Sequence, residues 1–206
     1  MLDIDFAQVF LAFLVLLFSL TVHEAAHAWT ADRLGDPTAR LLGRVSFNPI
    51  VHADPIGTIL FPLLALVAHV PLIGWVKPVP VNVQRLRHTR RDYVLVAAAG
   101  PASNLILALA VSLLLRVTPV SSGAALPAIL GVALQLNVLL AVFNMIPIPP
   151  LDGGNVIGGL LPVGLARRFD TTIRPYGFIL LYALMLTRGF DYVVVPPASF
   201  LLSWLR

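Results

Sequence analysis

The residues best suited to chemistry lie at positions 23–27, which read His-Glu-Ala-Ala-His. Two histidines four positions apart fall on one face of a helix, so both imidazoles can reach a single metal ion. Glu24 would lie beside that ion without binding it, where its carboxylate could take a proton from water. The chain contains no cysteine, so imidazole and carboxylate groups must supply the ligands.

A third ligand is expected from Asp152, which follows the proline-rich stretch at 147–150. An acidic group in such apolar surroundings needs a cation. Two histidines and one carboxylate leave the fourth position of a tetrahedral zinc ion open. The alternative is that Asp152 caps the short helix expected at 155–161. We predict one zinc ion per chain, held by His23, His27 and Asp152.

The elements that position these residues are apolar. Hydrophobic residues make up 58% of the 206 positions and charged residues only 12%, whereas soluble domains are about a quarter charged. We therefore expect an all-α polytopic membrane protein with one membrane-embedded domain over 1–206. Its catalytic core would cover about 6–160, and a C-terminal helix and tail would cover 175–206. The net charge of +4 lies in loops and does not indicate a nucleic-acid partner.

About four crossings are expected, at 6–31, 93–116, 127–147 and 175–195. The histidines end the first crossing and Asp152 follows the third. They share a depth only if residues 56–83 turn back inside the membrane, as a re-entrant helix and extended segment. Eleven of the fourteen Lys and Arg residues then lie on the histidine side. Because cytoplasmic loops are rich in these residues, we expect the site near the cytoplasmic face.

Three other polar residues each have two interpretations. Asn104 lies in an apolar helix, where its amide could join helices or bind a substrate. His52 and Asp54 could support the metal site from behind its ligands, or they could shape a turn before Pro55.

Three separated motifs together resemble the site-2 proteases, the intramembrane zinc metallopeptidases of peptidase family M50. These motifs are His23-Glu24-Ala-Ala-His27, Gly100-Pro101-Ala-Ser-Asn104, and Asn144 through Asp152-Gly153. The stretches at 43–55 and 74–82 look like the compact bacterial and archaeal branch, which lacks PDZ and CBS domains. We expect neither domain in the chain, so that regulation by such a domain would be absent or supplied by a membrane partner.

The resemblance implies a multi-pass protein of a prokaryotic cell membrane that cleaves transmembrane protein substrates within the lipid bilayer. It implies that Glu24 is the catalytic base and that the zinc ligands are the three residues named above. It also implies that Asn104 and Asn144 hold the substrate or stabilise the oxyanion. The extended stretch at 77–83 could pair with an unwound substrate by strand addition.

Two other classes of protein fit part of the pattern. A divalent-cation transporter would also carry intramembrane histidine and aspartate, but it would be expected to show internal repeats, and the sequence shows none. A non-catalytic membrane scaffold would not need the zinc site. Metal content and the effect of Glu24→Gln separate these alternatives from a protease.

Overall fold

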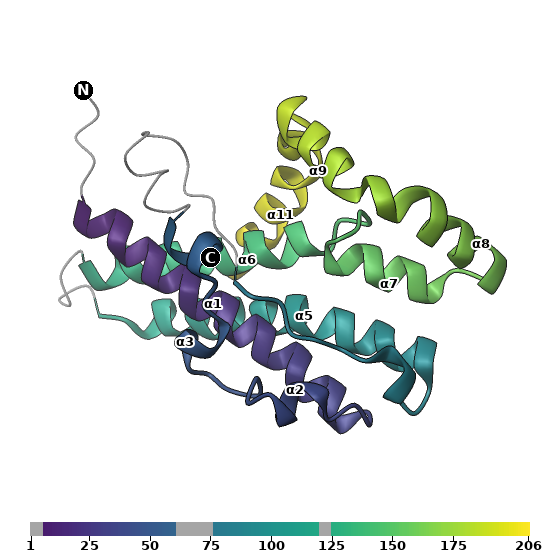
Figure 1. Cartoon of the computed structure of the whole chain (residues 1–206). Coiled ribbons are helices and arrows are strands. Elements are labelled where there is room, and N and C mark those ends of the chain that lie inside the picture. Colours follow the sequence, from purple (N-terminus) through teal and green to yellow (C-terminus); the bar gives the residue numbers. More distant parts are fainter. Residues whose placement is uncertain (1–5, 61–75, 120–124) are drawn as a thin grey trace.

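The structure, a computed structural model, describes residues 6–60, 76–119 and 125–206. Within these ranges the chain is built of helices and turns and contains no strand (Figure 1). Among the described residues, three helices are long and apolar enough to cross a membrane. They are α1 (Phe6–Arg33), α5 (Thr89–Val117) and α6 (Ala125–Asn144). The prediction of an all-α membrane protein is confirmed.

Helix α5 is the centre of the molecule, because it packs against α1, α6 and the short helix α7 (Asp152–Leu160). Its contact face is made of small residues, among them the buried Ala97, Gly100 and Ala108. Small side chains let neighbouring membrane helices approach closely. A Cβ atom at Gly100 would collide with both imidazoles of the HEAAH motif.

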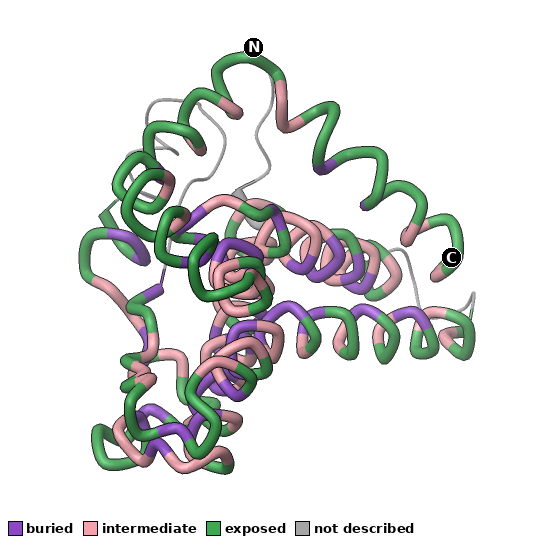
Figure 2. The backbone as a smooth tube through the Cα atoms, turned by 90° about the vertical axis from the view of Figure 1, so that its right-hand side faces the viewer, coloured by how far each residue is buried: buried purple, intermediate pink, exposed green. Residues whose placement is uncertain are grey.

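The C-terminal part wraps around this bundle as a series of short helices, most of whose residues are exposed (Figure 2). They are α8 (Val163–Arg168), α9 (Gly177–Leu186), α10 (Gly189–Val193) and α11 (Val195–Leu205), with a π-helical turn (Phe169–Ile173) and a 3₁₀ turn (Arg174–Tyr176) after α8. Helix α11 returns to the bundle, where Ala198 joins a buried cluster with Leu134 and Val138 of α6. Phe190 of α10 also packs against Phe143 of α6, with the ring centroids 6.0 Å apart.

The single crossing expected at 175–195 is therefore not one continuous helix. The chain turns at Arg188, which has a left-handed backbone with φ 59°, and α11 begins with two prolines. A proline within a helix removes a backbone donor and clashes with the preceding turn, so α10 cannot continue through these prolines and α11 begins as a separate helix.

The connection between α1 and α5 contains α2 (Thr38–Leu41), α3 (Pro49–His52), a π-helical turn (Pro55–Leu60) and a 3₁₀ turn (Val83–Arg85). Most of the expected re-entrant segment, 61–75, lies outside the described residues, so that expectation stays a prediction. Residues 76–82 form neither helix nor strand, and we call them the extended segment.

Candidate metal centre

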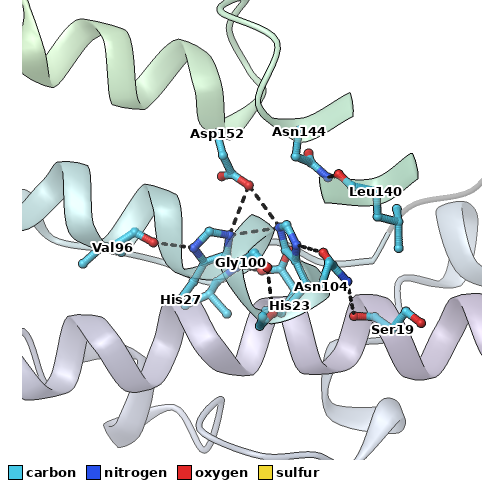
Figure 3. Close-up of polar contacts among 12 residues, drawn as sticks. Ser19, His23, His27, Val96, Gly100, Asn104, Leu140, Asn144 and Asp152 are labelled. Atoms are coloured by element: carbon cyan, nitrogen blue, oxygen red, sulfur yellow. Dashed lines mark hydrogen bonds and ion pairs between the residues drawn. The ribbon is translucent and has the colours of Figure 1, made fainter. Parts of the chain in front are cut away.

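Two elements far apart in the sequence bring three ligand groups together (Figure 3). His23 and His27 lie in the second half of α1, and Asp152 is the first residue of α7. Oδ2 of Asp152 is 3.1 Å from Nε2 of His23 and 3.4 Å from Nε2 of His27. The two Nε2 atoms are 3.1 Å apart. One ion could touch all three atoms, which form a cluster with the geometry of a metal site.

The turn before α7 places Asp152 by close backbone packing. Cβ atoms at Gly153 and Gly154 would collide with the main chain of residues 145–149, so only glycine fits at both positions. The N-cap of α7 is Leu151, which makes no side-chain capping bond. Among the described residues, the carboxylate of Asp152 therefore faces the histidines and does not cap its helix.

Each imidazole is oriented by a hydrogen bond on its far side. Nδ1–H of His23 donates to Oδ1 of Asn104 at 2.6 Å, and Nδ1–H of His27 donates to the carbonyl of Val96 at 2.7 Å. A carbonyl oxygen can only accept, so the proton of each neutral ring sits on Nδ1. The Nε2 atoms then carry lone pairs, as metal ligands must.

The residues present fit a cation. Both Nε2 lone pairs and Oδ2 of Asp152 point at the same small space, and this oxygen is buried without a hydrogen-bond partner. These three atoms are all acceptors, and their close approach is unfavourable unless a positive charge lies among them.

Glu24 faces the same pocket but belongs to a different set of contacts. It is the single glutamate of the chain. Its Oε2 accepts a hydrogen bond of 2.8 Å from the backbone N–H of Val79, in the extended segment. The pocket, of about 260 Å³, is lined by Glu24, the three ligand residues and part of the extended segment. A carboxylate beside the metal position, but outside the ligand cluster, is suited to moving a proton.

The two predicted asparagines lie in different surroundings. Asn144 lines the pocket, and its Nδ2 donates to the carbonyl of Leu140 at 3.0 Å (Figure 3). Asn104 is fully buried behind His23 and does not line the pocket. These contacts favour the joining of helices by Asn104 over the binding of a substrate.

His52 and Asp54 lie outside the metal cluster. Nε2 of the fully buried His52 pairs with the carbonyl of Ser46 at 2.9 Å. Oδ1 of Asp54 accepts hydrogen bonds from the backbone N–H groups of Ile56 and Gly57. These contacts match the turn interpretation and give neither side chain a bond to a ligand residue.

Sequence reasoning missed three groups around the site. The Val96 carbonyl and the Val79 N–H carry no sequence signal, because every residue has a main-chain carbonyl and almost every residue an N–H. Asn137 could have been found, since a polar residue in a membrane helix is commonly functional. It lies seven positions before Asn144, on the same helix face.

A cluster of two histidines and one carboxylate among membrane-length helices, with a glutamate in the same pocket, is typical of the class of membrane-embedded metallopeptidases. The model of peptidase family M50 matches residues 11–122 and 117–187. The chain belongs to this family, the site-2 proteases, and is an integral membrane protein.

Two curated relatives show the same similarity. The chain is 41% identical over 191 residues to "Putative zinc metalloprotease YwhC" of Bacillus subtilis (strain 168), covering 89% of this chain and 83% of that protein. It is 36% identical over 92 residues to "Putative zinc metalloprotease Rip2" of Mycolicibacterium smegmatis, covering 45% of this chain and 34% of that protein. No solved structure matches the chain.

Proposed function

We propose that the chain is an intramembrane zinc metalloprotease that cleaves peptide bonds of transmembrane proteins. The observation that carries this proposal is the convergence of three ligand lone pairs beside Glu24 in one pocket. The relative from Bacillus subtilis, named as a zinc metalloprotease, supports the choice of metal. The apolar helices support substrates that lie in the same bilayer.

His23, His27 and Asp152 would hold one zinc ion per chain. When bound, the ion supplies Lewis acidity to a water molecule and to the carbonyl of the scissile bond. Glu24 takes a proton from the attacking water and returns it to the leaving amine. The hydrogen bond from Val79 holds Oε2 of Glu24, which leaves Oε1 to receive the proton.

A substrate helix must unwind before its backbone can enter this pocket, because helical carbonyls are already hydrogen-bonded. The extended segment offers a surface for the unwound chain, since Pro78, Val79 and Val81 line the pocket. Pro78 and Pro80 lack an N–H, so the edge that presents Val79 is the one with donors. Asn144 is a pocket amide whose second Nδ2 hydrogen could bond a substrate carbonyl. The charge distribution supports a site near the cytoplasmic face.

Replacement of Glu24 by glutamine tests the proposal. Glutamine keeps an oxygen that can accept from Val79 N–H, but it cannot serve as a base at neutral pH. Cleavage should fall by roughly 10²- to 10⁴-fold, while one zinc ion per chain is retained. Comparing membrane-protein fragments from cells with the native and Glu24→Gln proteins would also identify substrates.

Asp191→Asn is the matched control, because this carboxylate is exposed, pairs with Arg188 and lies outside the metal cluster and its pocket. Unchanged cleavage in Glu24→Gln would refute the role of Glu24. A purified native chain that binds no zinc would refute the proposal as a whole.

A further inference from the structure

Behind His23 lies a connected set of buried polar groups contributed by three helices. Its members are Ser19 of α1, Asn104 of α5 and Asn137 of α6, which we call the amide relay. Their exposed fractions are 1%, 0% and 2%. Buried amides and hydroxyls in apolar surroundings are costly unless they are hydrogen-bonded. The residues of the relay must therefore be hydrogen-bonded. The hydrogen bonds that the structure shows determine which end of each amide donates and which end accepts.

The orientation of the Asn137 amide is set by a main-chain carbonyl. Nδ2 of Asn137 donates to the carbonyl of Ala133 at 2.9 Å and to Oγ of Ser19 at 2.9 Å. The carbonyl of Ala133 can only accept, so the amide nitrogen of Asn137 must face it. Oδ1 of Asn137 then points the other way and accepts from Nδ2 of Asn104 at 3.0 Å.

The same logic fixes the next amide. Because Nδ2 of Asn104 faces Asn137, with a longer 3.4 Å contact to the carbonyl of Ser19, its Oδ1 must face His23. This oxygen accepts a hydrogen bond from Nδ1–H of His23 at 2.6 Å. The carbonyl of Ala133 thus determines, through two amides, which nitrogen of His23 carries the proton.

We propose that Asn137 and Ser19 are positioning residues for the metal centre, which act through Asn104 to hold His23 in its Nδ1–H form. This inference rests on the proposed zinc site. If the amide of Asn104 turned over, its Nδ2 would face Nδ1 of His23. The ring proton would then move to Nε2, where it blocks the metal ligand.

The two histidines differ in whether their hydrogen-bond partner must be held in one orientation by other residues. The partner of His27 is the backbone carbonyl of Val96, which cannot turn over within its helix. The partner of His23 is a side-chain amide, whose two ends have nearly the same shape and can exchange. Only His23 therefore requires a second layer of contacts.

The test is Asn137→Leu, which keeps the branched shape of the side chain and removes both ends of the amide. Zinc affinity of the detergent-purified protein, measured by competition with a chelator, should fall by about 10- to 100-fold. Nitrogen-15 NMR of the imidazoles in the metal-free protein should show a mixture of tautomers for His23 and a single one for His27. Ser19→Ala, a milder change, should shift both readouts in the same direction.

A double-mutant cycle separates positioning from general stability. Once Asn104 is replaced by leucine, Asn137→Leu should cause no further loss of zinc affinity, because its effect passes through Asn104. Ser112→Ala is the control: this buried α5 residue bonds to the carbonyl of Leu205, two turns from Asn104. It should lower thermal stability and leave zinc affinity unchanged.

Unchanged zinc affinity in folded Asn137→Leu, or additive losses in the cycle, would overturn the inference. If Asn137→Leu does not fold, Ser19→Ala decides by the same criteria. A native chain that binds no zinc would instead overturn the proposed function, and the tautomer of His23 would still report on the relay.

Discussion

The back and the front of the metal centre are built differently. At the back, His23 and His27 are hydrogen-bonded to buried groups of the central helix α5. At the front, the half-buried Glu24 accepts a hydrogen bond from the backbone N–H of Val79, in the extended segment, which has no regular secondary structure. The positions of the proposed metal ligands thus depend on helix packing, whereas the position of Glu24, the proposed proton-transfer group, depends on the loop between α1 and α5. Changes at the back should alter metal binding, and changes at the front should alter turnover alone.

The largest effect is expected from Asp152→Ala. It removes the only carboxylate of the ligand cluster, so we expect no zinc to survive purification and no cleavage. Elemental analysis of the purified protein measures the metal. Asp170→Ala, at an exposed carboxylate, should retain one zinc ion per chain. Full zinc content in Asp152→Ala would show that Asp152 is not a ligand.

Gly100→Ala tests the packing that holds the histidines in place. Its Cβ would collide with both imidazoles, so the rings must move or the helices must separate. We expect zinc affinity to fall at least about tenfold and the free energy of unfolding to fall by about 1–3 kcal/mol.

Gly131→Ala is the matched control on α6, where a Cβ would meet nothing within 4 Å. It should leave zinc affinity unchanged and raise stability by up to about 1 kcal/mol, the difference in helix propensity. Equal zinc affinity in the two variants would contradict the close packing of α5 against the site.

At the front, Val79→Pro removes the N–H that holds Glu24. Zinc should remain bound, while the cleavage rate falls about 10- to 100-fold because the carboxylate is no longer held in place. Val81→Pro is the comparison, since its N–H bonds to no described residue. A loss confined to Val79→Pro supports an action through Glu24, whereas equal losses support strand addition by the whole segment. Intact cleavage in both variants would discard both roles.

The smallest effect is expected from Asn144→Ala, which removes a pocket amide that contacts no ligand residue. Loss of one hydrogen bond to a substrate carbonyl costs about 0.5–1.5 kcal/mol. KM should therefore rise by a few-fold, with zinc content unchanged. Asn155→Ala is the comparison, because Asn155 also lines the pocket and its Oδ1 accepts from Arg174. An equal rise of KM in both variants would show that Asn144 has no special part in binding the substrate. A loss of zinc in Asn144→Ala would place Asn144 with the back of the site.

The sequence by itself determined the membrane class and the grouping of the two histidines. Both follow from local properties: composition sets the solvent in which the chain is stable, and a four-residue spacing sets the helix face. Asp152 could be predicted as well, because an acidic residue in apolar sequence has few other ways to be stabilised. The family motifs pointed to the same residues.

Only the tertiary structure decided how these residues are held. It placed Asn104 behind His23 instead of in the pocket, joined Asn137 and Ser19 to it, and gave His27 and Glu24 main-chain partners. It also divided the helix expected at 175–195 at Arg188. Main-chain groups are nearly the same in every sequence, and an amide shows its direction only through its neighbours. Such contacts depend on which helices lie side by side, which local patterns do not encode.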